Sequence, residues 1–389
     1  MTLPKRPGRN RRPLAVGLVA AAAVAIPAAL ATPALGVAEP AADHAAAPPA
    51  AGIRPLAAES VTVFASPDPE RIYCYSPGIL RLASGRLVAT LDLGGPGMEA
   101  WTDGPTGVRG ARKVQGRVFT SDDGGATWQQ RQIFPFMHAR PFTAGGRVYV
   151  LGHAGDLMAI ASDDDGDSWS APARLTSGED WTQAPCNVLE ANGCVYLVMN
   201  RRPYPHQGIW PVSVEAPVLM RGRAEADLLA PANWTFGSQL VFRDAVKAES
   251  LDFFGVPFFA TKPTATTFPA KDRAMAPIGW LETNVVQFAD PDHVWHDPAG
   301  KTFHLWSRAH TGGTGYAAIC KAVEQGKAAG SGPIKTVLEH APSGKRMVFV
   351  PCPGGQMKFH VLYDEPTKRY WLLSTQATDS MTRPDRLPA

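Results

Sequence analysis

The sequence predicts an all-β fold assembled from repeated antiparallel sheets. Short runs of apolar and β-branched residues alternate with turn-forming clusters along the body of the chain, and no long stretch has the 3.6-residue period of a helix. Two copies of one eight-residue pattern, residues 121–128 and 162–169, stand 41 residues apart. A repeat at that spacing corresponds to one supersecondary unit, which favours solenoids and propellers.

Both copies of the pattern read Ser-x-Asp-x-Gly-x-(Thr/Ser)-Trp. The defining residues are Ser121, Asp123, Gly125 and Trp128 in the first copy, and Ser162, Asp164, Gly166 and Trp169 in the second. Ser and Asp side chains hydrogen-bond nearby backbone amides, Gly tolerates a positive φ, and the Trp anchors the turn. The pattern therefore predicts a self-contained turn between two strands, with a structural role.

This pattern resembles the Asp box of the sialidase superfamily, in which it joins the third and fourth strands of a propeller blade. Residues 116–120 and 157–161, which precede the two turns, are apolar and strand-forming, as the resemblance requires. The resemblance implies a sialidase-like β-propeller, a fold that usually has six blades in that family.

Five strand–turn–strand patterns mark successive blades. Their turns lie at residues 83–85, 143–146, 191–193, 297–300 and 364–367, and each is followed by an apolar strand. They predict at least five blades. Only residues 374–389 follow the last pattern, so we expect an incomplete or unusual C-terminal blade, because a missing blade exposes unpaired edges.

The first 38 residues have the order of a secretory signal peptide: five basic residues, an apolar run over residues 14–31, and small residues up to residue 38. An uncleaved membrane anchor is the alternative, because the apolar run is about long enough to span a bilayer. Pro27, Pro33 and the abundance of alanine favour cleavage. Arg11 and Arg12 lack the usual twin-arginine flanks, so we expect export by the Sec route to the periplasm or the medium.

The rest of the chain divides into a linker and one domain. Residues 39–58 are rich in Ala and Pro and predict a disordered linker, and the propeller domain is expected over residues 59–389. Without the signal peptide the chain has 33 basic and 35 acidic residues, a formal net charge of −2. No basic surplus favours nucleic acid, and no membrane association is expected after cleavage.

Five cysteines lie in the expected domain, and export would permit disulfides. Cys186 and Cys194 flank a predicted hairpin and are the most favoured pair. No Cys-x-x-Cys or His-rich spacing indicates a zinc site, and we expect neither a metal nor a cofactor.

Polar residues on strands that should be buried are the candidates for a site, because propellers bind substrates at the mouth of the central channel. One such face, on residues 303–310, consists of His304, Trp306, Arg308 and His310. A second, on residues 355–361, consists of Gln356, Lys358 and His360. Buried polar faces need hydrogen-bond partners, water or a ligand, and a satisfied structural network is the alternative for each residue.

Further candidates are Arg140, His153, Asp156 and Glu282. Asp290, Asp292 and His293 form a group that is more typical of a turn. The glycine-rich residues 311–315 follow His310 and would permit close backbone approach to a ligand.

The resemblance implies a retaining glycosidase with a tyrosine nucleophile paired to a glutamate, an aspartate acid/base, and three arginines that bind the substrate carboxylate. The family's first arginine belongs to a motif that ends in proline. When Pro77 is placed on that proline, Tyr75 stands where the arginine is expected. This departure argues against hydrolysis of sialic acid itself.

Three functions stay open. The first is hydrolysis of an acidic glycan; the catalytic candidates are Glu282, His310 and His360, and the substrate-binding candidates are Arg140, His153, Arg308, Gln356 and Lys358. The second is a propeller polysaccharide lyase, in which a histidine removes a proton beside a uronate whose charge Arg308 or Gln356 neutralises. The third is a carbohydrate-binding propeller without catalysis. In each case the partner is a carbohydrate.

Overall fold

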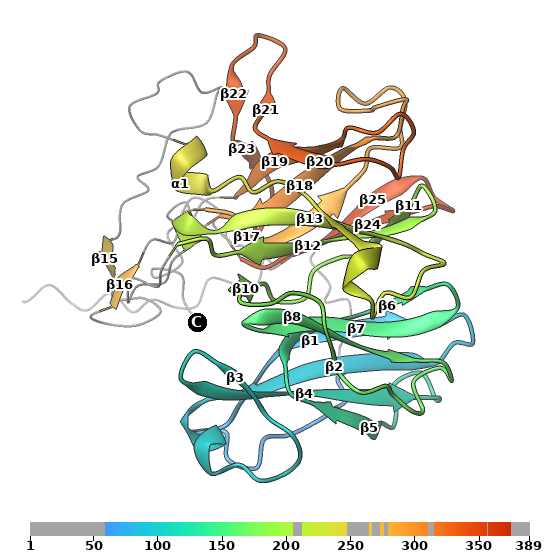
Figure 1. The fold of residues 1–389 in the computed structure, drawn as a ribbon, viewed down its shortest axis with the longest axis vertical. Coiled ribbons are helices and arrows are strands. Elements are labelled where there is room, and N and C mark those ends of the chain that lie inside the picture. Colours follow the sequence, from blue (N-terminus) through green and yellow to red (C-terminus); the bar gives the residue numbers. More distant parts are fainter. Residues whose placement is uncertain are drawn as a thin grey trace, which may run out of the picture. The chain divides into compact units, whose positions relative to one another are not determined.

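The computed structural model describes residues 59–204, 212–246, 264–266, 273–275, 279–309, 315–355 and 357–374 (Figure 1). The expected signal peptide and linker lie outside the described residues. Helical structure within them is limited to α1 (Phe242–Ala245) and three short 3-10 turns, at Pro96–Ala100, Val212–Val214 and Pro231–Asn233. No helix in this part of the chain has the length and hydropathy of a membrane span. The predicted all-β class is confirmed.

Four antiparallel sheets follow one another along the chain (Figure 1). The first contains β1 (Tyr73–Arg81), β2 (Leu87–Gly94), β4 (Arg112–Ser121) and β5 (Gln129–Phe134), with β3 (Gly107–Arg109) also paired to β4. The second contains β6 (Met137–Ala144), β7 (Arg147–Ala154), β8 (Asp156–Ser162) and β9 (Ala173–Arg174).

The third sheet contains β12 (Cys194–Arg201), β13 (Ala216–Arg223) and β14 (Trp234–Phe236), with β10 (Trp181–Thr182) and β11 (Leu189–Ala191) both paired to β12. The fourth contains β17 (Leu281–Val286), β18 (Thr302–Arg308), β19 (Tyr316–Glu324) and β20 (Ile334–Val337), with β23 (Phe349–Pro351) also on β19. Three two-stranded hairpins complete the described strands: β15 (Thr264–Thr266) with β16 (Arg273–Met275), β21 (Glu339–His340) with β22 (Arg346–Met347), and β24 (His360–Asp364) with β25 (Arg369–Leu373).

Successive meanders that pack face to face define a β-propeller. Strands β1 and β2 contact β6, β7 contacts β10, β12 contacts β17, and β17 contacts β24, so the first or second strands of successive units lie next to one another. The five predicted hairpins are all present, as β1–β2, β6–β7, β11–β12, β17–β18 and β24–β25. In the β11–β12 hairpin, Asn192 and Gly193 have φ of 54° and 67°, the positive values that a two-residue type I′ turn requires.

The core lies between neighbouring sheets, and β12 shows how alternation builds it. Its residues Val195, Leu197 and Met199 pack with the second sheet, whereas Tyr196 and Val198 pack with the fourth. Side chains alternate across a strand, so a central strand sandwiched between two sheets must be apolar on both faces. This explains why the strand sequences are nearly continuous hydrophobic runs.

The predicted disulfide between Cys186 and Cys194 is wrong, because all five cysteines are free. Cys194 begins β12 and lies opposite Ala191, and the ladder ends with Leu189 opposite Tyr196. Cys186 lies three residues before Leu189, outside the paired part of the hairpin, and so does not face Cys194.

The two eight-residue repeats form the same hydrogen-bond network in the structure. In the first, the Asp123 carboxylate accepts from the Thr127 amide at 2.9 Å and its hydroxyl at 2.6 Å, and the indole of Trp128 donates to the Gly125 carbonyl at 2.9 Å. In the second, Asp164 accepts from Ser168 at 2.8 and 2.5 Å in the same way. The turns connect β4 to β5 and β8 to β9, so each joins the third and fourth strands of its meander.

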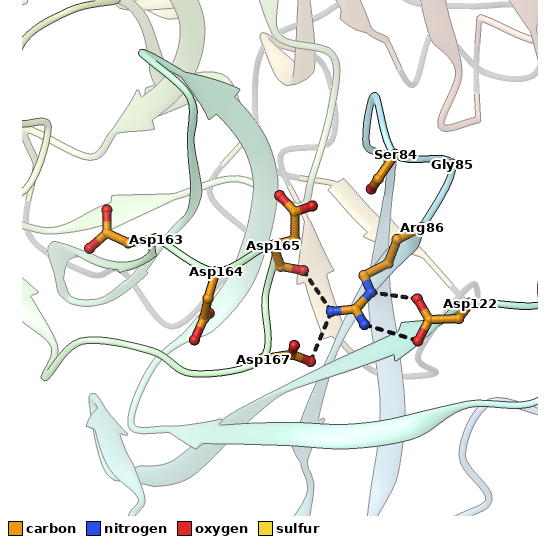
Figure 2. Close-up of a pocket in the computed structure, with 8 residues that line it drawn as sticks. All are labelled: Ser84, Gly85, Arg86, Asp122, Asp163, Asp164, Asp165 and Asp167. Atoms are coloured by element: carbon orange, nitrogen blue, oxygen red, sulfur yellow. Dashed lines mark hydrogen bonds and ion pairs between the residues drawn. The ribbon is translucent and has the colours of Figure 1, made fainter.

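An arginine directly before β2 connects the two repeats. Figure 2 shows Arg86 between Asp122 of the first turn and Asp167 of the second, at 2.6 and 2.8 Å. Arg147, at the start of β7, binds Asp163 at 2.5 Å and Asp227 of the next sheet at 3.0 Å. The acidic pocket in Figure 2 is thus a junction between neighbouring sheets, and we give it a structural role.

Candidate functional site

Three of the first strands carry a β-bulge at the same register position. The pairing with the second strand shifts after Tyr75 in β1, after Met137 in β6 and after Leu281 in β17. The next residues are Ser76, His138 and Glu282, with φ of 53°, 55° and 52°. A positive φ strains a residue other than glycine, and such strain is concentrated at functional sites. The repeated strain therefore marks one end of the first strands as a candidate site.

Opposite each bulge, the second strand presents one polar residue. These residues are Asp92 on β2, His153 on β7 and Arg308 on β18. The ring atoms His153 Nε2 and His138 Nδ1 are 3.0 Å apart, and Arg308 Nη1 donates to Glu282 Oε2 at 3.1 Å. The Ser76 side chain lies close enough to Asp92 to lower the pKa of its carboxyl group. We call Ser76–Asp92, His138–His153 and Glu282–Arg308 the bulge pairs.

Asp92 links the first two bulge pairs. It is fully buried, and its Oδ2 accepts a hydrogen bond from the backbone amide of His138 at 2.7 Å. Burial raises the pKa of Asp92 well above its ordinary value, and the backbone amides of His138 and Ala139 offset only part of this effect. The carboxyl group therefore holds its proton more tightly than an exposed aspartate does.

The two histidines of the second pair are neutral. Burial lowers the pKa of both His138 and His153 well below the ordinary value, and the positive charge of Arg109 lowers both further. The Nδ1 atom of His153 is buried and has no hydrogen-bond partner in the described part of the chain. Two neutral imidazoles in contact can exchange a proton, which suits acid–base chemistry.

Positive charges surround the bulge pairs. The charge of Lys358 acts on Asp92, His138, Cys186 and His360, so this lysine lies where several first strands converge. Burial lowers the pKa of Arg109 to about 10, and Arg109 interacts with Tyr75 on β1. Nearby, Arg202 forms a 2.9 Å ion pair with the buried Glu215.

Arg140, the next substrate-binding candidate, lies two residues after the bulge of β6. Its side chain is 2% exposed, and burial lowers its pKa to about 10. Its charge and that of Lys358 act on His360, whose pKa falls to about 4, chiefly because the imidazole is buried. The charges of Arg140 and Lys358 both reach His360, and the thiol of Cys186 interacts with Arg140, Lys358 and Glu282.

The structure thus brings together most of the predicted site residues that it describes. His153 contacts His138, Glu282 contacts Arg308, and the charges of Arg140 and Lys358 both reach His360. His310 and Gln356 lie outside the described residues.

The expected polar face of β18 divides into two parts. His304 is 1% exposed, and its ring stacks on that of Trp295. Its Nε2 atom is hydrogen-bonded to Oε2 of Glu339 at 2.7 Å. Glu339 also binds Lys321 at 2.8 Å, so His304 belongs to a buried structural network. Trp306 packs with the apolar cluster around Ile319, and Arg308 alone of the described face reaches a bulge pair.

The remaining candidates have local roles. The Asp156 carboxylate accepts from the amides of Gly178 and Glu179 at 3.1 and 2.9 Å and so holds the loop before β10. Asp290 accepts from the Asp292 amide at 2.9 Å, which is the expected turn. Within the described residues, no cluster of three or more His, Cys, Asp or Glu side chains is arranged to hold a metal ion.

Sequence reasoning missed five site residues: Ser76, Asp92, Arg109, His138 and Arg202. Asp92 lies within the apolar strand β2, between Leu91 and Leu93, and a charged residue inside a buried strand was the available signal. The bulges themselves had little sequence signal, because Ser76 and Glu282 are of residue types that rarely adopt a positive φ, although histidine does so more often.

No protein-family model matches the chain, and no curated protein sequence matches it. Similar solved structures include an α-L-arabinanase from Penicillium chrysogenum, with 14% identity and a TM-score of 0.39 over 81% of this chain and 79% of that one. An α-L-arabinofuranosidase from Fusarium graminearum has 11% identity and a TM-score of 0.35, over 76% and 71%. The NanB sialidase from Streptococcus pneumoniae has 9% identity and a TM-score of 0.43, over 77% and 52%. The activity of this chain therefore has to be argued from its own residues.

Proposed function

We propose that this propeller is a glycoside hydrolase that acts on an acidic glycan. The observation that carries the proposal is the set of three bulge pairs, which places strained polar residues at the same end of the first strands of the first, second and fourth sheets. Two of these pairs contain carboxyl groups in contrasting environments: Asp92 is buried with a raised pKa, and Glu282 is partly exposed and ion-paired with Arg308. The positive charges of Arg109, Arg140 and Lys358 favour an acidic sugar.

Hydrolysis of a glycoside needs one group that gives a proton to the leaving oxygen and one carboxylate that attacks or activates water. We assign the second role to Glu282, because its carboxylate is partly exposed and held by Arg308. We assign the first role to Asp92, because burial raises its pKa and so keeps on its carboxyl group the proton that the leaving oxygen needs. The sialidase-like resemblance of the two repeats agrees with this class of reaction, while Tyr75 argues against sialic acid as the substrate.

A second candidate is β-elimination from a uronic acid. The observation that favours it is the neutral His138–His153 pair beside Arg109, since a lyase needs a base close to the proton and a cation close to the carboxylate. We also propose that the protein is exported, because the first 38 residues have the order of a signal peptide.

The test is to incubate the purified full chain with arabinan, polygalacturonate, hyaluronan and an aryl sialoside. Hydrolysis releases reducing ends without ultraviolet absorbance, whereas elimination produces an unsaturated uronate that absorbs. We expect reducing ends from an acidic polymer, and about a 100-fold or larger loss of rate in Glu282→Gln, because that change removes the attacking carboxylate.

Asp292→Asn is the matched control, since Asp292 is an exposed carboxylate beyond the other end of β17. It should keep the wild-type rate. Absorbing products would instead establish the lyase, and binding of a glycan without any product would establish a binding protein. Full activity in Glu282→Gln would remove Glu282 from the mechanism.

A further inference from the structure

Arg140 is a buried cation without a counter-ion in the described part of the chain. Its only hydrogen bond there is from Nη1 to the carbonyl oxygen of Asn187, at a long 3.5 Å. The Nε and Nη2 atoms are buried, and neither has a hydrogen-bond partner among the described residues. Because an arginine that is 2% exposed is normally paired, these two N–H groups indicate a missing acceptor.

The groups around Arg140 do not supply that acceptor. Lys358 adds a second positive charge, which acts with that of Arg140 on both His360 and Cys186. Burial raises the pKa of the Cys186 thiol to about 11, so the thiol is neutral at pH 7. Glu282 is the carboxylate that interacts with Cys186, and it is already ion-paired with Arg308. None of these groups is therefore a free counter-ion for Arg140.

The fold does not require an arginine at this position. The equivalent residues in the other two bulged strands are Gly78 and Asn284, each of which follows its bulge residue by two positions. Asn284 connects sheets, since its Nδ2 donates to the carbonyl of Phe359 at 3.1 Å. Gly78 is closely covered, since a Cβ there would lie 2.6 Å from Cδ of Pro141. Neither equivalent places a charge there, so the guanidinium of Arg140 needs a reason other than packing.

We infer that Arg140 forms an anion subsite that binds the carboxylate or sulfate group of an acidic sugar. This inference rests on the proposed function, because it names the substrate class of the same site. A guanidinium presents its N–H groups as a planar fork, which matches two oxygens of a carboxylate or sulfate.

The experiment measures binding of small sugars to the full chain by calorimetry and by thermal unfolding. The ligands are glucuronate, glucose 6-sulfate, glucose and inorganic sulfate, and the variants are Arg140→Met, Arg140→Lys and Arg81→Met. Arg81 is an exposed arginine of β1 and serves as the matched control. We expect one or both acidic sugars to bind and glucose not to bind. Arg140→Met should weaken that binding by about 10- to 100-fold, and Arg140→Lys should weaken it less.

A further readout distinguishes binding from a structural role. Without ligand, Arg140→Met should unfold at the same or a higher temperature than the wild type, because it removes an unpaired buried charge. A clearly lower unfolding temperature would contradict the inference, as would equal binding of glucose and glucuronate, binding of inorganic sulfate alone, or unchanged acidic-sugar binding in Arg140→Met.

The two proposals fail separately. If acidic sugars bind through Arg140 but no glycan is cleaved, the proposed hydrolysis is wrong and the anion subsite stands. If the protein cleaves a neutral glycan, and Arg140→Met cleaves it at the same rate, the anion subsite is wrong and the hydrolysis stands.

Discussion

Replacement of Glu324 by methionine is predicted to destabilise the propeller more than any exposed change. Glu324 lies on β19, is 1% exposed, and accepts from Arg221 of β13 at 2.5 Å, from the Tyr196 hydroxyl at 3.0 Å and from the Gly330 amide at 2.6 Å. It therefore joins the third sheet to the fourth. Glu324→Met leaves Arg221, itself only 7% exposed, as an uncompensated buried charge.

Breaking a buried ion pair by removing one partner costs about 3–5 kcal/mol. The hydrogen bonds lost from Tyr196 and Gly330 fall within that range, since each contributes about 1 kcal/mol net. The double variant Arg221→Met/Glu324→Met removes both charges, so it should recover most of the loss. The stability losses of Arg221→Met and Glu324→Met must therefore be strongly non-additive in the double variant.

Urea unfolding followed by circular dichroism gives the free energy of unfolding of the wild type, both single variants and the double variant. The reasoning would be refuted by a Glu324→Met loss below about 1 kcal/mol, the size of an ordinary exposed pair. A double variant as unstable as the sum of the singles would also refute it, because the cost would then come from lost packing.

Three further predictions concern Glu339, His153 and Ser76. Hydrogen bonds from His304 and Lys321 lower the pKa of Glu339 from 4.5 to about 2, so its ionised form stabilises the fold above pH 4.5 and this contribution is lost as the pH falls towards 2. In Glu339→Gln, the free energy of unfolding should therefore fall less steeply between pH 4.5 and pH 2 than in the wild type. An equal fall in both proteins would contradict the assignment. Burial lowers the pKa of His153, so the folded state loses stability as the pH falls below 6.5. Between pH 6.5 and about pH 5, the free energy of unfolding of His153→Gln should therefore fall less than that of the wild type. Ser76 has a φ of 53°, which glycine adopts without strain and valine does not. Ser76→Gly should therefore unfold at the wild-type urea concentration or above it, whereas Ser76→Val should lower the free energy of unfolding by about 1–2 kcal/mol. Equal stability of the two variants would show that the bulge relaxes without strain.

Local chemistry explains what was predictable. The two eight-residue turns were readable because Asp123 and Asp164 bond to residues only four positions away, so the pattern contains its own partners. The hairpins were readable for the same reason, as in the Asn192-Gly193 turn. By contrast, the predicted pairing of Cys186 with Cys194 assumed a longer hairpin ladder than the chain forms.

The candidate site was only partly predictable, because its residues meet through strand register. The sequence predicted five of its residues from polar side chains on expected strands: Arg140, His153, Glu282, Lys358 and His360. Their partners depend on which residue of the second strand faces each bulge, and a one-residue slip in register would exchange the faces. The alternation of side chains along β18 grouped His304 with Arg308. In the structure, His304 binds Glu339, which also binds Lys321, and His304 does not contact a bulge pair.

The sequence by itself determined the all-β class, the hairpins and the two turns, because these depend on contacts within a few residues. Only the tertiary structure decided that Ser76, His138 and Glu282 occupy equivalent strained positions and that Asp92, His153 and Arg308 face them. It also decided that Arg140 is buried without a counter-ion in the described part of the chain. The physical reason is that burial, and the pKa changes it causes, depend on which sheets pack together, and that information is not present in any single segment.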